Sequence, residues 1–200
     1  GVANKWSIAW GITQACIGAG ANIVLTYQGE RNESSLRKLT ADLPHIRLYK
    51  CDVTQDQDII QLFDNIEKDI GIIHGIVHSI AFAKKEELEG AYYDTTREGY
   101  RLAQDISAYS LVAISKYGRP LIKEGGSILT LTYLGGERVV ENYNVMGVAK
   151  SALESSVLAE YNVFEHTNDP LHASTQHGAT LKSIGNLYIN SPGEGLWVDT

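Results

Sequence analysis

No hydrophobic run in the sequence approaches the roughly 20 residues that a membrane-spanning helix needs. Residues 1–10 match neither a signal peptide nor a transit peptide. We therefore expect a protein without a membrane segment, without a targeting segment and without a membrane partner.

Basic residues are scarce. Lysine and arginine number 17 against 24 aspartates and glutamates, which gives a formal net charge of −7 at pH 7. Proteins that bind nucleic acid usually present a basic face, and a basic amphipathic helix for a membrane surface is equally absent. The charge balance therefore argues against a nucleic-acid partner.

Cysteine is also rare. The chain has 2 cysteines, Cys16 and Cys51, which fall in a predicted helix and at a predicted strand end. Without a secretory signal, so few cysteines are typical of reduced thiols, and we expect a cytoplasmic protein.

The remaining composition is ordinary for a globular protein. The chain has 200 residues, of which 44% are hydrophobic and 20% are charged, and this length is enough to bury a core. No repeat, low-complexity tract or linker interrupts it. We therefore expect a single domain over residues 1–200.

Strand and helix patterns alternate along most of the chain. Short apolar runs predict strands at residues 22–27, 46–51, 72–80 and 127–133. Helical patterns fall at residues 7–18, 30–43, 55–69, 96–121 and 143–160, with Ser7 and Thr54 as expected N-caps. This alternation is typical of an α/β fold with a doubly wound parallel sheet that is covered on both faces.

Two parts of the chain depart from that pattern. A doubly wound fold has a strand before its first glycine turn, whereas this sequence begins at the turn, at Gly1, so that the first strand is expected to be lacking. Beyond Glu160 the alternation is lost. That segment contains residue types that bind metals, namely His166, Asp169, His172 and His177. Their spacing matches no metal site, and we expect a polar loop and no metal.

A glycine turn followed by a helix start lies at residues 1–11. Such a turn points backbone N–H groups and the positive end of the helix dipole toward an anion, which suits a pyrophosphate. The glycine spacing is not the usual G-x-G-x-x-G, so the motif alone also fits an ordinary turn and a capped helix.

Polar side chains follow the predicted strands. Gln28, Asp52 and Ser79 each stand where a strand ends, and ligands of open α/β sheets bind beyond the carboxyl ends of the strands. Asp52 there could accept a hydrogen bond from an adenine amine. A turn or helix-cap aspartate explains it equally well.

Tyr143 and Lys150 stand seven residues apart in a predicted helix. This spacing is about two helical turns, so both side chains share one face at ~10 Å. A neutral phenol donates a hydrogen bond, and a lysine adds positive charge beside an oxygen that becomes negative. Tyr133 follows the neighbouring strand, where a substrate would lie. The alternative is a partly buried aromatic residue and a solvated surface lysine.

Several strings of residues occur in an informative order. They are GVANKWSIAWG (1–11), CDV (51–53), HSIAFA (78–83), QDISAYSL (104–111), TYLGGE (132–137) and NYNVMGVAK (142–150). Together, from Gly1 to about Ala159, they resemble the bacterial NADH-dependent enoyl-acyl-carrier-protein reductases, a divergent branch of the short-chain dehydrogenase/reductase family. Ketoacyl reductases carry Tyr-x-x-x-Lys instead, whereas Gly147 stands four residues after Tyr143 here.

The resemblance implies a Rossmann-type fold and a nicotinamide cofactor. Gln28 is neutral and no basic residue follows it, which favours NADH and makes NADPH the less favoured cofactor. The residues implied to bind the cofactor are Gly1, Ser7, Ile8, Gln28, Asp52, Val53, Ser79, Ile80 and Lys150.

The resemblance also implies hydride transfer from NADH to the β-carbon of a trans-2-enoyl thioester in fatty-acid elongation. Tyr143 would hydrogen-bond the thioester carbonyl, and Lys150 the nicotinamide ribose. The residues implied to be catalytic are Tyr133, Tyr143 and Lys150, and those implied to contact substrate are Ala83, Tyr133, Tyr143 and Met146. The implied partners are acyl carrier protein and further copies of the chain, in a homotetramer that packs through the helix at 96–121.

The resemblance is incomplete after the helix that carries Lys150. The strand and loop with which the family holds the nicotinamide are not found between Tyr161 and Pro192, so residues 161–192 are divergent and the C-terminal part is shortened. Residues 193–200 resemble the last strand of the family. Two alternatives stay open, a catalytically silent cofactor-binding or assembly relative and a short-chain reductase with another substrate.

Overall fold

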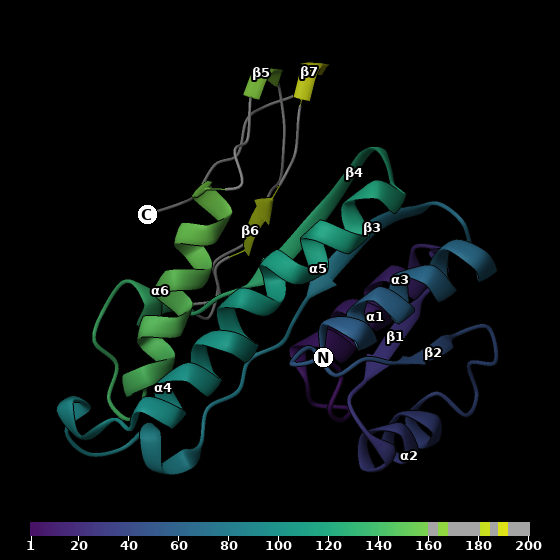
Figure 1. Ribbon diagram of the computed structural model, residues 1–200. Coiled ribbons are helices and arrows are strands. Elements are labelled where there is room, and N and C mark those ends of the chain that lie inside the picture. The colour runs from purple at the N-terminus through teal and green to yellow at the C-terminus, as the bar shows by residue number, and fades with distance from the viewer. Residues whose placement is uncertain (160–163, 168–180, 185–187, 192–200) are drawn as a thin grey trace. The chain divides into compact units, whose positions relative to one another are not determined.

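Figure 1 shows the protein as a computed structural model, which describes residues 1–159, 164–167, 181–184 and 188–191. The chain forms two compact units, Gly1–Gly71 and Ile72–Thr200. The expectation of a single domain stays a prediction. The strand expected at residues 193–200 lies outside the described residues, as do Asp169, His172 and His177.

The first unit alternates helices and strands as the sequence predicts. Its elements are α1 (Ile8–Gly18), β1 (Val24–Tyr27), α2 (Glu30–Leu39), β2 (Arg47–Lys50) and α3 (Asp56–Asp69). β1 and β2 are parallel, with Val24 opposite Arg47 and Tyr27 opposite Lys50. Trp10 of α1, Leu25 of β1 and Leu36 of α2 are buried in one hydrophobic cluster.

The ends of these helices test the expected caps. Ser7 is the N-cap of α1, because its side-chain oxygen accepts the Trp10 N–H at 3.3 Å. Thr54 as the cap of α3 is wrong. Gln55 holds that position, and the Thr54 hydroxyl instead donates to Asp52 Oδ1 at 2.8 Å. α2 ends at Leu39, before the predicted residue 43.

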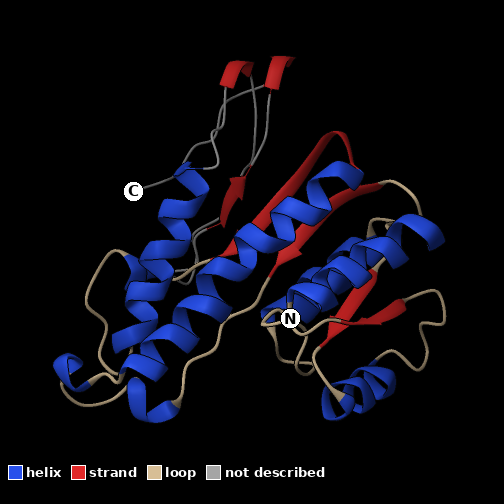
Figure 2. Cartoon of the chain, viewed as in Figure 1, coloured by secondary structure: helices blue, strands red, loops and turns tan. Residues whose placement is uncertain are grey.

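The second unit combines a parallel strand pair with helices. Its elements are β3 (Ile73–His78), η1 (Lys85–Glu87), η2 (Tyr92–Asp94), α4 (Arg97–Gln104), η3 (Asp105–Tyr109), α5 (Ser110–Gly118), η4 (Arg119–Leu121), β4 (Ile122–Leu131), η5 (Leu134–Gly136), α6 (Asn144–Ala159), β5 (Phe164–Thr167), β6 (Leu181–Ile184) and β7 (Tyr188–Ser191). β3 and β4 are parallel, β6 pairs antiparallel with β4, and β5 is parallel to β7. Figure 2 shows α5 lying along the β3–β4 pair, whereas α4 lies beside α6. The expected α/β class with parallel strands is confirmed.

The helix predicted at residues 96–121 is one run with an interruption. A π-helical turn, η3, separates α4 from α5. β4 begins at Ile122, five residues earlier than predicted at 127, and ends at Leu131 instead of residue 133. A shift of register between Ile73 and Gly75 accommodates the longer strand.

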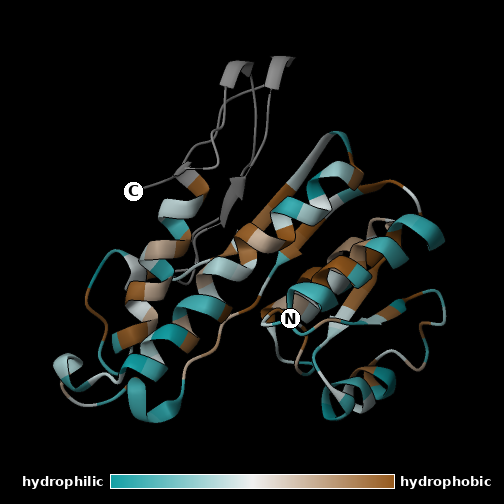
Figure 3. Cartoon of the chain, viewed as in Figure 1, coloured by the Kyte–Doolittle hydropathy of each residue, from teal (hydrophilic) through white to brown (hydrophobic). Residues whose placement is uncertain are grey.

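The core of the second unit lies between α6 and its neighbours. Val145, Ala149 and Leu153 of α6 have no exposed surface, and Ile128 of β4 is buried in the same cluster as Leu153. Figure 3 shows hydrophobic segments on part of β4 and on α6, between hydrophilic ones. Full burial of such a side chain stabilises a fold by about 1.5–3 kcal/mol, so α6 is held firmly against β4. Among the described residues, no helix has the length and apolar character to cross a bilayer.

Candidate active site

A buried histidine ends β3. The two ring nitrogens of His78 lie 2.9 Å from Thr130 Oγ1 and 2.8 Å from Ser110 Oγ. The Ser110 hydroxyl donates to the Ile106 carbonyl at 2.7 Å, so its oxygen accepts from His78 Nε2–H, and His78 Nδ1 accepts from Thr130. Burial lowers the pKa of His78 to about 3. The ring is therefore neutral and ties β3 to β4 and α5.

The loop after β3 is fixed by the π-helical turn. The Phe82 N–H donates to Ser107 Oγ at 3.0 Å, and the Ser107 hydroxyl donates back to the Phe82 carbonyl at 3.1 Å. Ser107 is fully buried, and Ser79 and Ile80 in the same loop are half-buried. The turn thus positions the segment in which cofactor and substrate residues were predicted.

Three of the predicted substrate residues belong to one hydrophobic cluster. Met146 is buried between α4 and α6, and Ala83 and Tyr143 pack against it as partly buried members. Apolar side chains of this kind are suitable neighbours for an acyl chain. Spacing in the sequence does not show that Ala83 joins the other two, because the loop that carries it lies 60 residues before Tyr143 (143 − 83).

Tyr133 and Tyr143 face each other at the end of β4. Their ring centroids lie 5.0 Å apart at an interplanar angle of 65°, an edge-to-face contact. Burial, with a smaller contribution from Tyr133, raises the pKa of Tyr143 to about 12. The Tyr143 phenol is therefore protonated at neutral pH and able to donate a hydrogen bond.

Tyr143 is not inside the helix, contrary to the prediction. α6 begins at Asn144, and the Tyr143 carbonyl accepts the N–H of Gly147 at 2.9 Å. The direction of its ring is set by η5, because a Cβ at Gly135 would lie 2.6 Å from Tyr143 Cε1. A glycine at position 135 is therefore what lets the ring lie against the turn.

Lys150 is buried, with 6% of its surface exposed. Its Nζ donates to the Leu131 carbonyl at 2.8 Å, at the last residue of β4. Burial lowers the pKa of the Lys150 ammonium group, and the charge of Glu154 opposes that change. The alternative of a solvated surface lysine is wrong, because Lys150 is buried. A buried lysine whose pKa is shifted is typical of a functional site.

The close contact of η5 with α6 also explains the spacing of the Tyr143–Lys150 pair. A Cβ at Gly147 would lie 2.7 Å from the Gly135 carbonyl oxygen. No side chain fits there while η5 keeps its place. A lysine four residues after Tyr143, as in ketoacyl reductases, is thus incompatible with this turn.

The first unit holds the other predicted cofactor residues. Ile8 is the first residue of α1 and 64% exposed, and Ser7 precedes it as the cap. The first turn of a helix leaves N–H groups without intrahelical partners, and these fit a phosphate. Gly1 comes close to β1, because a Cβ there would lie 3.8 Å from the Thr26 carbonyl oxygen.

Gln28 and Asp52 meet at the ends of β1 and β2. Gln28 Nε2 donates to Asp52 Oδ2 at 3.1 Å, while Asp52 Oδ1 accepts the Thr54 N–H at 3.0 Å. Desolvation raises the pKa of Asp52, but the hydrogen bonds from Thr54 and Gln28 outweigh it and the pKa lies below its ordinary value. Asp52 is therefore an ionised turn aspartate with an oxygen toward Gln28. Val53 follows it, half-buried.

The donors and acceptors of the first unit fit an adenine dinucleotide. The α1 N-terminus offers N–H groups to phosphates, and Gln28 and Asp52 offer an amide and a carboxylate to a ribose and an adenine amine. Among the described residues, no group of three or more histidine, cysteine, aspartate or glutamate side chains could hold a metal ion.

Some polar residues around the strand ends of the second unit were not predicted from the sequence. They are His78, Ser107, Ser110, Thr130, Thr132 and Glu154, which form buried hydrogen bonds around the strand ends. A histidine at the end of an apolar strand and two serines in an apolar helix were available signals. The partners of these side chains depend on pairing between distant segments.

Known proteins are similar to this chain over most of its length. A profile described as enoyl-(acyl carrier protein) reductase matches residues 1–159. The enoyl-[acyl-carrier-protein] reductase [NADH] FabI of Bacillus subtilis is 55% identical over 159 residues, which cover 78% of this chain and 62% of that protein. The enoyl-[acyl-carrier-protein] reductase [NADPH] FabI of Staphylococcus aureus is 50% identical over 159 residues, with the same coverage of 78% and 62%.

A solved structure agrees with these relatives. The Bacillus cereus enoyl-acyl carrier protein reductase, crystallised with NADP+ and indole naphthyridinone, superposes with a TM-score of 0.76 at 52% identity, over 78% of this chain and 62% of that one. The chain thus spans about 62% of the length of these relatives. With its Rossmann-type α/β fold and a profile match that covers more than half of its residues, the chain belongs to the enoyl-acyl-carrier-protein reductase family.

Proposed function

We propose that the protein reduces trans-2-enoyl thioesters of acyl carrier protein with a reduced nicotinamide cofactor, as a step of fatty-acid elongation. Two contacts at the carboxyl end of β4 carry the proposal. The rings of Tyr133 and Tyr143 touch, and buried Lys150 donates to the last residue of the same strand, Leu131. The relatives of known name act as enoyl reductases, which supports the same reaction for this chain.

The cofactor that fits the first unit is NADH. Gly1, Ser7 and Ile8 would hold the phosphates, and Gln28 with Asp52 the adenosine. When bound, the cofactor supplies the hydride for the reduction. The ionised Asp52 beside Gln28 would repel a 2′-phosphate and disfavour NADPH. The family includes NADH-named members, such as that of Bacillus subtilis, and an NADPH-named member from Staphylococcus aureus.

In the second unit, the resemblance to the enoyl reductases suggests a role for each predicted residue. Ser79 and Ile80 would contact the nicotinamide half of the cofactor, and Lys150 its ribose. The protonated Tyr143 would donate a hydrogen bond to the thioester oxygen, and the Lys150 charge would stabilise that oxygen as it becomes negative. Tyr133 supports the Tyr143 ring edge-to-face.

The acyl chain has an apolar surface available beside these groups. Ala83 and Met146 belong to the same cluster as Tyr143, and they would line the acyl chain next to the carbonyl. Shortening either of these side chains would let the thioester move relative to the Tyr143 phenol and slow the reaction, because the reaction depends on orientation.

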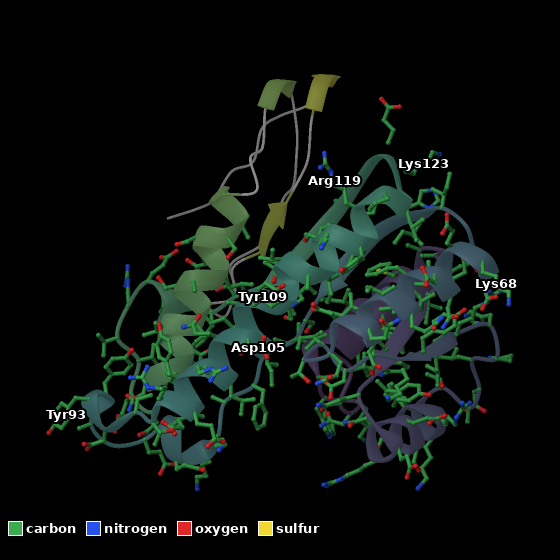
Figure 4. The ribbon with its side chains drawn as sticks, viewed as in Figure 1. Lys68, Tyr93, Asp105, Tyr109, Arg119 and Lys123 are labelled. Carbon is green, nitrogen blue, oxygen red and sulfur yellow. The ribbon has the colours of Figure 1, made fainter. Side chains whose placement is uncertain are left out.

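We also propose an oligomeric state and a cellular location for the protein. Tyr100 of α4 and Tyr109 of η3 are 41% and 51% exposed, and Figure 4 labels Tyr109 on the helical run. Exposed tyrosines on a long helix are typical of interface residues, which supports a homotetramer formed through α4–α5. Cys16 and Cys51 are free thiols, which supports a cytoplasmic location.

The experiment is the decay of NADH absorbance with crotonyl thioester. We expect the wild-type chain to oxidise NADH, and the variants Tyr143→Phe and Lys150→Ala to lose about 10²-fold or more in kcat/KM. Equal rates for all three proteins would refute the assigned roles. NADH binding by calorimetry without turnover in the wild type would instead favour a catalytically silent relative.

A further inference from the structure

A buried carboxylate without a part in the proposed reaction lies one helical turn beyond Lys150. Glu154 is 8% exposed, and its Oε1 accepts the Thr132 hydroxyl at 2.6 Å. Residues four apart on a helix are neighbours on its surface, so Glu154 and Lys150 point the same way from α6.

These two side chains hold consecutive residues of the strand end. Lys150 Nζ donates to the Leu131 carbonyl at 2.8 Å, and Glu154 accepts from Thr132, the next residue. Tyr133 follows directly. The backbone that leads into Tyr133 is therefore fixed by adjacent turns of α6.

η5 closes over the same carboxylate. A Cβ at Gly136 would lie 2.9 Å from Glu154 Oε1 and 3.2 Å from the backbone of Lys150. The turn therefore packs directly on α6 at both residues. Glu154 is enclosed by the segment that carries the two tyrosines, and little room is left for water beside its Oε1.

The charges of this cluster have a definite balance. Burial lowers the pKa of the Lys150 ammonium group, and the charge of Glu154 raises it. His78 on β3 also acts on Lys150 electrostatically, but the ring is neutral because burial lowers its pKa to about 3. Tyr143 stays protonated far above neutral pH. The negative charge of Glu154 is thus what opposes the desolvation of Lys150.

We propose that Glu154 is a positioning residue of the enoyl reductase, which keeps the Lys150 ammonium group charged and, through Thr132, holds the strand end before Tyr133. It acts on the reaction through these residues and does not touch the substrate. The proposal rests on the function proposed above.

The test separates the charge of Glu154 from its hydrogen bond. Glu154→Gln keeps an acceptor for Thr132 and removes the charge, whereas Thr132→Val removes the hydrogen bond and keeps the charge. kcat/KM for crotonyl thioester is measured against pH, because its alkaline limb reports the pKa of an essential group of the free enzyme.

We expect Glu154→Gln to move the alkaline limb down by about one pH unit or more. Glu154 lies one helical turn from Lys150, and a nearby opposite charge favours the charged form of a lysine by about that amount. Thr132→Val should leave the limb in place and raise KM by about threefold through a looser Tyr133. Glu154→Asp, which keeps the charge, should restore the limb.

A second buried glutamate provides the matched control. Glu87 is 5% exposed and accepts hydrogen bonds from the Thr96 backbone N–H and hydroxyl. Glu87→Gln therefore changes a buried, threonine-bonded carboxylate in the same way, and we expect it to leave the alkaline limb unchanged.

The titration of Lys150 is also followed by NMR of 13C-labelled lysine, which needs no activity. An unmoved Lys150 pKa and an unmoved limb in Glu154→Gln would overturn the proposal. If the wild-type chain fails to reduce any enoyl thioester, the function proposed above fails, while the NMR titration still decides whether Glu154 sets the charge of Lys150. If Glu154→Gln does not fold, Glu154→Met removes the same charge from a side chain of similar length. Its NMR titration is then compared with that of Thr132→Val, which lacks the same hydrogen bond and keeps the charge.

Discussion

The arrangement of Tyr133 and Tyr143 depends on Gly147. Gly147 lies in the first turn of α6, and its N–H donates to the Tyr143 carbonyl. The Gly135 carbonyl occupies the space that a side chain at position 147 would need. Where two backbone segments come this close, only glycine fits without a shift of its neighbours. The proposed role of Tyr143 as a hydrogen-bond donor thus depends on a residue that has no side chain.

We expect Gly147→Ala to destabilise the chain by about 1–3 kcal/mol, because the new methyl group would overpack against Gly135. η5 would have to move, and with it Tyr143, so kcat/KM should fall about tenfold or more. Urea unfolding and the NADH assay measure the two effects.

The matched control for this substitution is Gly11→Ala in α1. Gly11 also lies in a helix, but nothing lies within 4 Å of a Cβ built there. We expect it to be stabilising by about 0.5–1 kcal/mol, because alanine is the better helix former. Equal stability changes in both variants would show that Gly135 does not restrict position 147.

At the scale of elements, the π-helical turn between α4 and α5 is the feature that the sequence did not predict. Hydrophobic periodicity predicts the whole run from 96 to 121, but it averages over turns and does not detect one extra residue in a single turn. That turn places Ser107 and Ser110 against β3 and its loop. The helical run was thus predictable, but the π-helical turn within it was not.

Ser107→Ala tests the turn against a serine in the same helical run. Both Ser107 hydrogen bonds to the Phe82 backbone are lost, and we expect a destabilisation of about 1–3 kcal/mol because buried backbone groups are left unpaired. The Phe82 amide should exchange its hydrogen faster, and KM for the thioester should rise. Hydrogen exchange by NMR measures the amide directly.

Ser115→Ala is the matched control. Ser115 is also buried, at 3% exposed, but its hydroxyl has no hydrogen-bond partner. We expect a change within about 0.5 kcal/mol and unchanged exchange at Phe82. A similar response of both variants would mean that burial alone, and not the bond to Phe82, accounts for the effect.

At the scale of the whole molecule, the sequence predicted the α/β class and the order of the elements as far as α6. It did not predict β5, β6 and β7, which lie where a polar loop was expected. The roles of Tyr133, Tyr143 and Lys150 stay predictions. The sequence placed element ends with errors of up to five residues, as at the start of β4, because strand length is set by pairing with β3 across the register shift. Contacts between distant segments, such as His78 with Thr130 and Ser110, follow from the fold and not from local pattern.

That buried histidine couples the stability of the fold to pH. Burial disfavours the charged ring and lowers the pKa of His78 from 6.5, its value in an unfolded chain, to about 3. Between these pH values the unfolded chain binds more protons than the folded chain, so the free energy of unfolding rises with pH in this window and falls on acidification. At pH 5 the loss relative to pH 7 is roughly 2 kcal/mol.

We expect His78→Gln to remove that part of the pH dependence, since glutamine does not titrate. Urea unfolding at pH 7 and pH 5 compares the variant with the parent, and His45→Gln, at an exposed position, serves as the control that should keep the parent's dependence. The variant should be less stable at pH 7, because one or both of the hydrogen bonds to Thr130 and Ser110 are lost, yet it should lose less on acidification. Parallel stability curves for His78→Gln and the parent would mean that His78 takes up its proton without unfolding, and that the link between β3, β4 and α5 does not depend on a neutral ring.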